Sequence, residues 1–101
     1  RRNHQDESEF RAMAHHKDAI KRIKQNEGRR ARNRHYRSTM RNQVKRVREA
    51  VESGDVDSAQ AQLRRAVSVI HRVVSKGVIH RNQAARSISR LNKAVKALAL
   101  Q

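Results

Sequence analysis

The chain has 101 residues, and its 25 lysines and arginines against nine acidic residues give a net charge of +16. This length suits one small domain, and the absence of proline together with scarce glycine excludes most β-sheet architectures. The absence of cysteine excludes disulfides, thiolate metal sites and thiol catalysis, and no apolar run approaches the roughly 20 residues of a membrane span.

The first predicted helix covers residues 17–53. In its second half, Met40, Val44, Val47 and Val51 follow at spacings of four, three and four, which places them on one helical stripe. Its first half has few apolar residues among many lysines and arginines. We therefore expect the first half to be helical by propensity, marginal alone, and ordered by a partner.

A basic run without acids occupies the middle of this helix. From Arg29 to Arg48 the chain carries nine basic side chains and no acidic one. A solvated helix face usually interleaves both signs, whereas a run of one sign repels itself and favours a polyanion such as nucleic acid. The only aromatic residues are Phe10 and Tyr36, so we expect contacts with backbone and shape rather than with splayed bases.

Two glycines separate three segments. Gly54 suits the left-handed residue that closes a helix, and Asp55 suits the N-cap of the next. Gly77 is a second helix stop, and the helices that follow the two breaks are predicted over residues 55–76 and 80–100. The apolar stripe of the second helix comprises Val56, Ala59, Leu63, Ala66, Val67, Ile70, Val73 and Val74, and that of the third comprises Ala84, Ala85, Ile88, Leu91, Val95 and Leu98.

Three apolar stripes joined by two short turns predict an all-α fold, namely an antiparallel three-helix bundle. The first helix would reach about 54 Å and the second about 30 Å at 1.5 Å per residue. A long basic first helix is therefore expected to protrude from the bundle. The core is lean in large side chains, so little surplus stability is expected.

The same residues argue against an enzyme or a metal protein. No Ser-His-Asp set, paired acidic site or glycine-rich phosphate loop is apparent. His15 and His16 point about 100° apart on a helix, so they cannot chelate one ion from there. No cofactor, metal or small-molecule substrate is therefore predicted. His80 opens the third helix, where it can either cap the helix or donate to RNA.

Several stretches carry a family resemblance. Met13–Glu27, Arg29–Arg34, Ala50–Asp55 and above all Lys76–Arg86, which reads Lys-Gly-Val-Ile-His-Arg-Asn-Gln-Ala-Ala-Arg, resemble bacterial small-subunit ribosomal protein number twenty. The resemblance covers Met13 to about Leu100 without a gap. It implies a three-helix bundle without catalytic activity that binds small-subunit rRNA directly and early in assembly. It also implies a place near the base of the subunit, between the 5′ domain and the long penultimate RNA helix.

The resemblance implies two groups of RNA-facing residues, one on the first helix and one at the second turn. The first group is Lys17, Lys21, Arg22, Lys24, Gln25, Asn26, Arg29, Arg30, Arg32, Asn33, Arg34, Arg37, Ser38 and Arg41, and the second is Lys76, Gly77, His80, Arg81, Asn82, Arg86 and Arg90.

Some positions depart from the family pattern. Gly28 stands where a lysine is usual, and Gln83, Ser87 and Ile88 replace positions that are often basic. Residues 1–12 precede the usual start, so they are a real arm, the stub of a processed presequence, or an upstream start. We expect residues 1–14 to form a flexible extension and residues 15–101 to form the three-helix rRNA-binding bundle.

The predicted function is that of a structural constituent of the small ribosomal subunit, which binds its rRNA mainly through phosphate and shape contacts and stabilises its folding and assembly. The alternative is an architectural DNA-binding protein, although no apolar wedge or strand arm is evident. A membrane-active or calmodulin-binding helix would need bulky apolar residues, and residues 17–48 contain no Trp, Phe or Leu. The expected partner is small-subunit rRNA, with few protein contacts in the ribosome and no membrane. The expected location is a bacterial ribosome in the cytoplasm, with an organellar ribosome as the alternative.

Overall fold

The computed structural model describes the backbone of residues 4–101 and the side chains from residue 11 onward. Within this range the chain forms α1 (His4–Ser53), α2 (Val56–Ser75) and α3 (Arg81–Ala99), and it contains no strand. The predicted all-α class with a long first helix is thereby confirmed. The chain divides into two units, Arg1–Arg32 and Asn33–Gln101, and α1 contributes residues to both.

Helix α1 begins at His4, earlier than the start predicted near residue 17. No glycine or proline interrupts the intervening residues, so the sequence allows the helix to continue through them. Most of the predicted extension is therefore helical. Its flexibility stays a prediction, and residues 1–3 of that extension lie outside the described residues.

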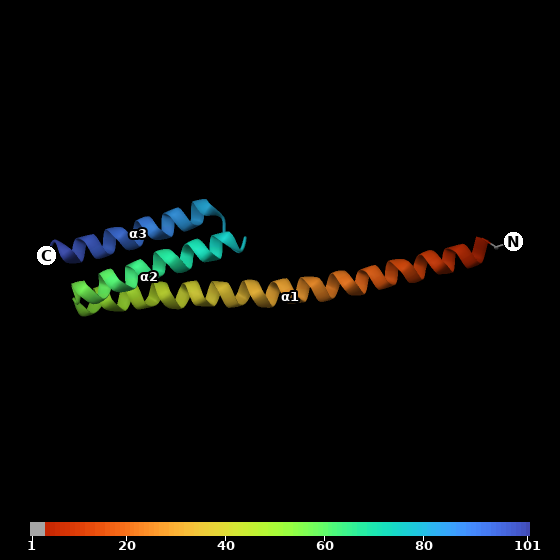
Figure 1. The fold of residues 1–101 in the computed structure, drawn as a ribbon, viewed down its shortest axis with the longest axis horizontal. Helices are drawn as coiled ribbons and strands as arrows, with labels where there is room; N and C mark the ends of the chain where they lie inside the picture. The colour runs from red at the N-terminus through yellow and green to blue at the C-terminus, as the bar shows by residue number, and fades with distance from the viewer. Residues whose placement is uncertain (1–3) are drawn as a thin grey trace. The chain divides into compact units, whose positions relative to one another are not determined.

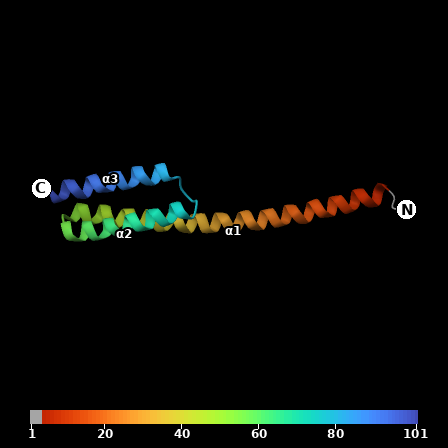
Figure 2. The same ribbon diagram turned by 45° about the horizontal axis from the view of Figure 1, so that its top comes forward.

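The core of residues 33–101 lies where the last part of α1 meets α2 and α3. In this part of the chain α2 runs antiparallel to both α1 and α3, and α1 and α3 run in the same direction (Figures 1 and 2). Each segment contributes buried residues from its predicted stripe, which confirms the helical periodicity read from the sequence. The core cluster is Val47, Ala50, Ala59, Ala66, Ile70, Ala84, Leu91 and Val95, with Met40, Val44, Val51, Leu63, Val74, Ile79, Ile88 and Leu98 packed against it.

Two residues depart from the expected core. Ala85 is exposed although it neighbours the buried Ala84, because adjacent residues on a helix point about 100° apart. Gln43 is buried, and its Nε2 donates to Gln62 Oε1 at 2.9 Å and to the Gln62 carbonyl at 3.2 Å. Because a buried amide is costly without partners, this pair satisfies a polar group between α1 and α2.

The C-terminal ends of α1 and α2 close in the same way. Gly54 has φ 77° and Gly77 has φ 72°, so each takes the left-handed conformation expected of a helix stop. At the second turn, the Gly77 N–H donates to the Val74 carbonyl and the Val78 N–H donates to the Val73 carbonyl. These two hydrogen bonds form a Schellman motif, and Val78, which follows the glycine, is buried.

Replacing Gly77 with alanine is expected to destabilise the bundle by about 1 kcal/mol, because a side chain disfavours the left-handed conformation. Nothing lies within 4 Å of a Cβ placed there, so the backbone conformation alone carries the cost. Thermal melting followed by circular dichroism measures the change. Gly28→Ala is the control: Gly28 lies inside α1 with open space around it, so alanine should favour the helix. Equal losses of melting temperature in both variants would contradict this account.

Candidate nucleic-acid interface

The cations of the first unit that the structure describes are all exposed to solvent. All side chains of residues 11–32 are exposed, including the apolar Ile20 and Ile23 at 40% and 57%. These residues therefore have no apolar core of their own. The predicted interface residues of this unit are all solvent-accessible: Lys17, Lys21, Arg22, Lys24, Gln25, Asn26, Arg29, Arg30 and Arg32.

In the second unit, the residues of α1 also expose basic side chains to solvent. Arg34, Arg37, Ser38 and Arg41 are exposed, whereas Asn33 is half-buried. The opposite face of α1 supplies the core residues Val47 and Ala50, because the helical repeat places apolar and basic residues on different sides of the helix. The charges are hardly neutralised: among residues 11–101, the ion pair present joins Lys45 Nζ to Glu49 Oε1 at 3.9 Å on the surface.

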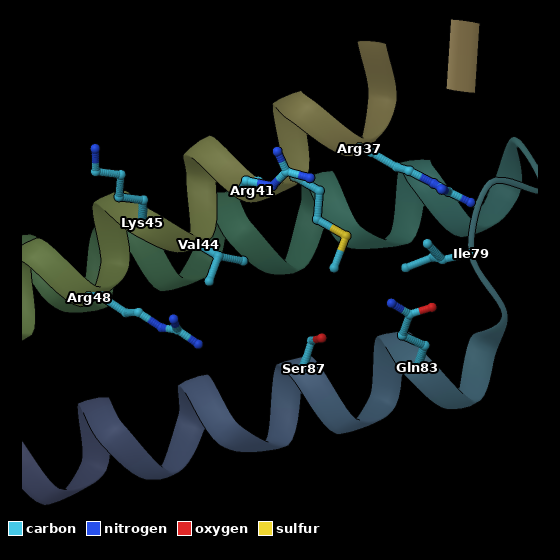
Figure 3. A pocket seen from close by; sticks show the side chains of 9 residues that line it. Arg37, Arg41, Val44, Lys45, Arg48, Ile79, Gln83 and Ser87 are labelled. Atoms are coloured by element: carbon cyan, nitrogen blue, oxygen red, sulfur yellow. The ribbon is translucent and has the colours of Figure 1, made fainter. Parts of the chain in front are cut away.

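A groove lies between α1 and α3 in this unit, and we name it the α1–α3 groove (Figure 3). It has a volume of about 710 Å³. Arg37 extends from α1 toward Ile79, and Gln83 and Ser87 point from α3 toward α1. The groove therefore joins a basic wall to a neutral polar wall. Its lining is Arg37, Met40, Arg41, Val44, Lys45, Arg48, Ile79, Gln83 and Ser87.

His80 is the N-cap of α3. Its Nδ1 accepts a hydrogen bond from the Asn82 backbone N–H at 3.1 Å, and the ring is exposed. The sequence left open whether His80 caps the helix or donates to RNA, and the structure shows that it caps the helix. The cap satisfies one of the free N–H groups that begin every helix.

The remaining predicted residues of the second turn do not converge on one spot. Arg81 lines a second groove of about 570 Å³ between α2 and α3, together with Lys93 and Lys96. Arg90 lines a smaller groove beside Glu52. The predicted residues of the second turn thus lie on different faces of the bundle. Lys76 is the C-cap of α2, and Lys76, Gly77, Asn82 and Arg86 are exposed.

Four polar residues of the groove were not included in the predicted interface. Lys45 and Arg48 belong to the basic run but were not assigned to the surface that faces RNA. Gln83 and Ser87 counted only as departures from basic positions. Gln83 and Ser87 lie four residues apart, and Lys45 and Arg48 follow Arg41 at spacings of four and three. These spacings are the signal that could have placed each set on one helix face.

Other kinds of site find no support in the described part of the chain. No group of three or more His, Asp or Glu side chains within it could hold a metal ion. None of the helices it forms is both long and apolar enough to cross a membrane.

Comparisons with known proteins identify the family of this chain. A family model described as Ribosomal protein S20 matches residues 14–96. The small ribosomal subunit protein bS20 of Trichlorobacter lovleyi is 60% identical over 86 residues, which cover 85% of this chain and 99% of that protein. Proteins with the same description from Pelobacter propionicus and Geobacter sulfurreducens are each 55% identical over 86 residues, with the same coverage. The chain belongs to the ribosomal protein S20 family.

Proposed function

We propose that the chain binds small-subunit rRNA directly, mainly through phosphate and shape contacts, and thereby stabilises the folding and assembly of that RNA. As a member of its family, the protein is a structural constituent of the small ribosomal subunit and is not an enzyme. The observation that carries the proposal is the fully exposed, largely unpaired set of lysines and arginines over residues 11–32 of α1. Such a surface needs a polyanion to neutralise it.

The residues proposed to contact RNA are those that the family resemblance implies along α1 and at the second turn. Their exposure supports this assignment, since a phosphate contact requires an accessible side chain. The bacterial relatives support a ribosome-bound location in a bacterial cytoplasm. RNA is the expected partner within the ribosome, with few protein contacts.

The preference for RNA over DNA tests the proposal against an architectural DNA-binding protein. The full chain is titrated with a small-subunit rRNA fragment and with a DNA duplex of equal length at the same salt concentration. Tighter binding to rRNA is expected, because an A-form helix presents 2′-hydroxyls and a different backbone spacing. Equal affinity for both would favour a general binder of nucleic acid and contradict the proposal. Co-sedimentation with small subunits through a salt wash gives the same answer in a cell extract.

A further inference from the structure

The α1–α3 groove combines apolar, cationic and neutral polar side chains in one concave surface. Its floor contains Met40, Val44 and Ile79, which are all half-buried and apolar. One wall is cationic and the other is neutral and polar. Its volume of about 710 Å³ lies within the range of about 300–1,000 Å³ that is usual for pockets of organic ligands.

The cations of the groove come from a single helix edge. Arg37, Arg41, Lys45 and Arg48 recur every three or four residues on α1, and all four are exposed. No acidic residue belongs to the groove lining, which lies wholly within the described residues. Arg48 points toward α3, and Arg37 points toward Ile79 (Figure 3). The guanidinium planes of both are thus placed beside an apolar floor, where they can bind an anion or stack on a flat ring.

The opposite wall adds hydrogen-bonding groups without charge. Gln83 carries a carbonyl oxygen and an amide, and Ser87 carries a hydroxyl, so together they can donate and accept. Gln83 is exposed and Ser87 is half-buried, and both point from α3 toward α1. A plain phosphate-binding edge would need neither an apolar floor nor this wall.

We propose that the α1–α3 groove holds one unpaired nucleotide of the RNA, and this inference rests on the proposed function. The cations bind its phosphate, the base lies on Met40, Val44 and Ile79, and Gln83 and Ser87 bond to the edge of the base. Phosphate, flat apolar ring and hydrogen-bonding edge match the three surfaces in turn. The scarcity of aromatic residues argues against a row of stacked bases, and the groove accommodates a single one.

A pair of RNA hairpins tests the inference. One hairpin has a fully paired stem. The other has the same loop and the same stem with a single bulged nucleotide, and each of the four bases is tried at the bulge. At equal salt, the full chain is expected to bind the best bulged hairpin about fivefold to tenfold more tightly, near the lower end of base stacking because the floor is aliphatic.

The α3 helix offers a matched pair of variants. Ser87→Leu fills the α1–α3 groove, whereas Ser89→Leu makes the same change two residues on, in the groove between α2 and α3. The preference for the bulged hairpin should disappear in Ser87→Leu and persist in Ser89→Leu. Thermal melting of both free variants checks the fold, and Gln83→Leu serves as the groove variant at an exposed position.

Methyl NMR of the unaltered protein provides a measurement that needs no variant. A base lying on the floor should shift the methyl signal of Ile79 through its ring current, while Ile88 in the other groove should stay unchanged. The fully paired hairpin should leave Ile79 unshifted.

The outcomes separate this inference from the proposed function. Equal, steeply salt-dependent affinity for both hairpins would contradict the binding of an unpaired nucleotide in the α1–α3 groove and leave the proposed function intact. Absence of salt-dependent binding to either hairpin would overturn both. A dimer in solution that Ser87→Leu abolishes would assign the groove to a second copy of the chain and contradict its binding of a nucleotide.

Discussion

Raising the salt concentration from 50 to 200 mM is expected to weaken rRNA binding about 10⁴-fold, because each phosphate contact contributes a slope of about −0.7 to −0.9 to log affinity against log salt. The exposed cations of α1 and the second turn supply on the order of ten such contacts. Equilibrium titration of rRNA with the full chain at four or more salt concentrations measures the slope. A nearly flat dependence would contradict binding through phosphates.

Two triple variants locate these contacts. Changing Arg29, Arg30 and Arg32 to glutamine should reduce the slope by about two units and lower the affinity about 100-fold or more at 0.1 M salt. The matched control changes three exposed arginines of α2 that lie outside the proposed interface, Arg64, Arg65 and Arg72. Both variants lose three charges, so an equal loss of affinity would mean that net charge alone governs binding and that α1 is no special surface.

Ile70→Ala is expected to destabilise the bundle by about 2–5 kcal/mol, the usual cost of emptying a buried aliphatic site. Ile70 is fully buried, and the cluster around it includes Ala50, Ala59, Ala66 and Ala84, which are too small to fill the space it would leave. Small domains have only about 5–15 kcal/mol of total stability, so this variant should be largely unfolded at modest urea concentrations.

Urea denaturation followed by circular dichroism measures the effect, with two controls. Ile70→Val removes one methylene and should cost about 0.5–1.5 kcal/mol. Ile23→Ala makes an isoleucine-to-alanine change at a position that is 57% exposed, so its denaturation midpoint should match that of the parent. Equal midpoints for Ile70→Ala and Ile23→Ala would show that Ile70 does not anchor the core.

Local chemistry made much of the fold predictable. Gly54 and Gly77 mark helix ends because few other residues accept a positive φ, and Asp55 marks a helix start because its carboxylate accepts the Ser58 N–H at 3.1 Å. Each of these effects acts within four residues of chain. The stripe of α2 likewise needs only the helical repeat.

The rest depends on how helices face one another. Burial of Gln43 follows from its meeting with Gln62, nineteen residues away, and no local pattern contains that pairing. The α1–α3 groove depends in the same way on the rotation of α3, which brings Gln83 and Ser87 opposite Arg37. Sequence could list the cations, but only the packing of the helices shows which of them share a concave surface.

The cap on α3 also fixes which nitrogen of a ring holds the hydrogen. Because His80 Nδ1 accepts the Asn82 N–H, the neutral imidazole carries its hydrogen on Nε2, in a single tautomer. The exposed edge of the ring thus offers a donor to whatever approaches, next to the arginine at position 81. The hydrogen bond that caps the helix at Nδ1 of His80 therefore makes Nε2 a hydrogen-bond donor in the neutral ring. A molecule that binds to Nε2 must supply a hydrogen-bond acceptor.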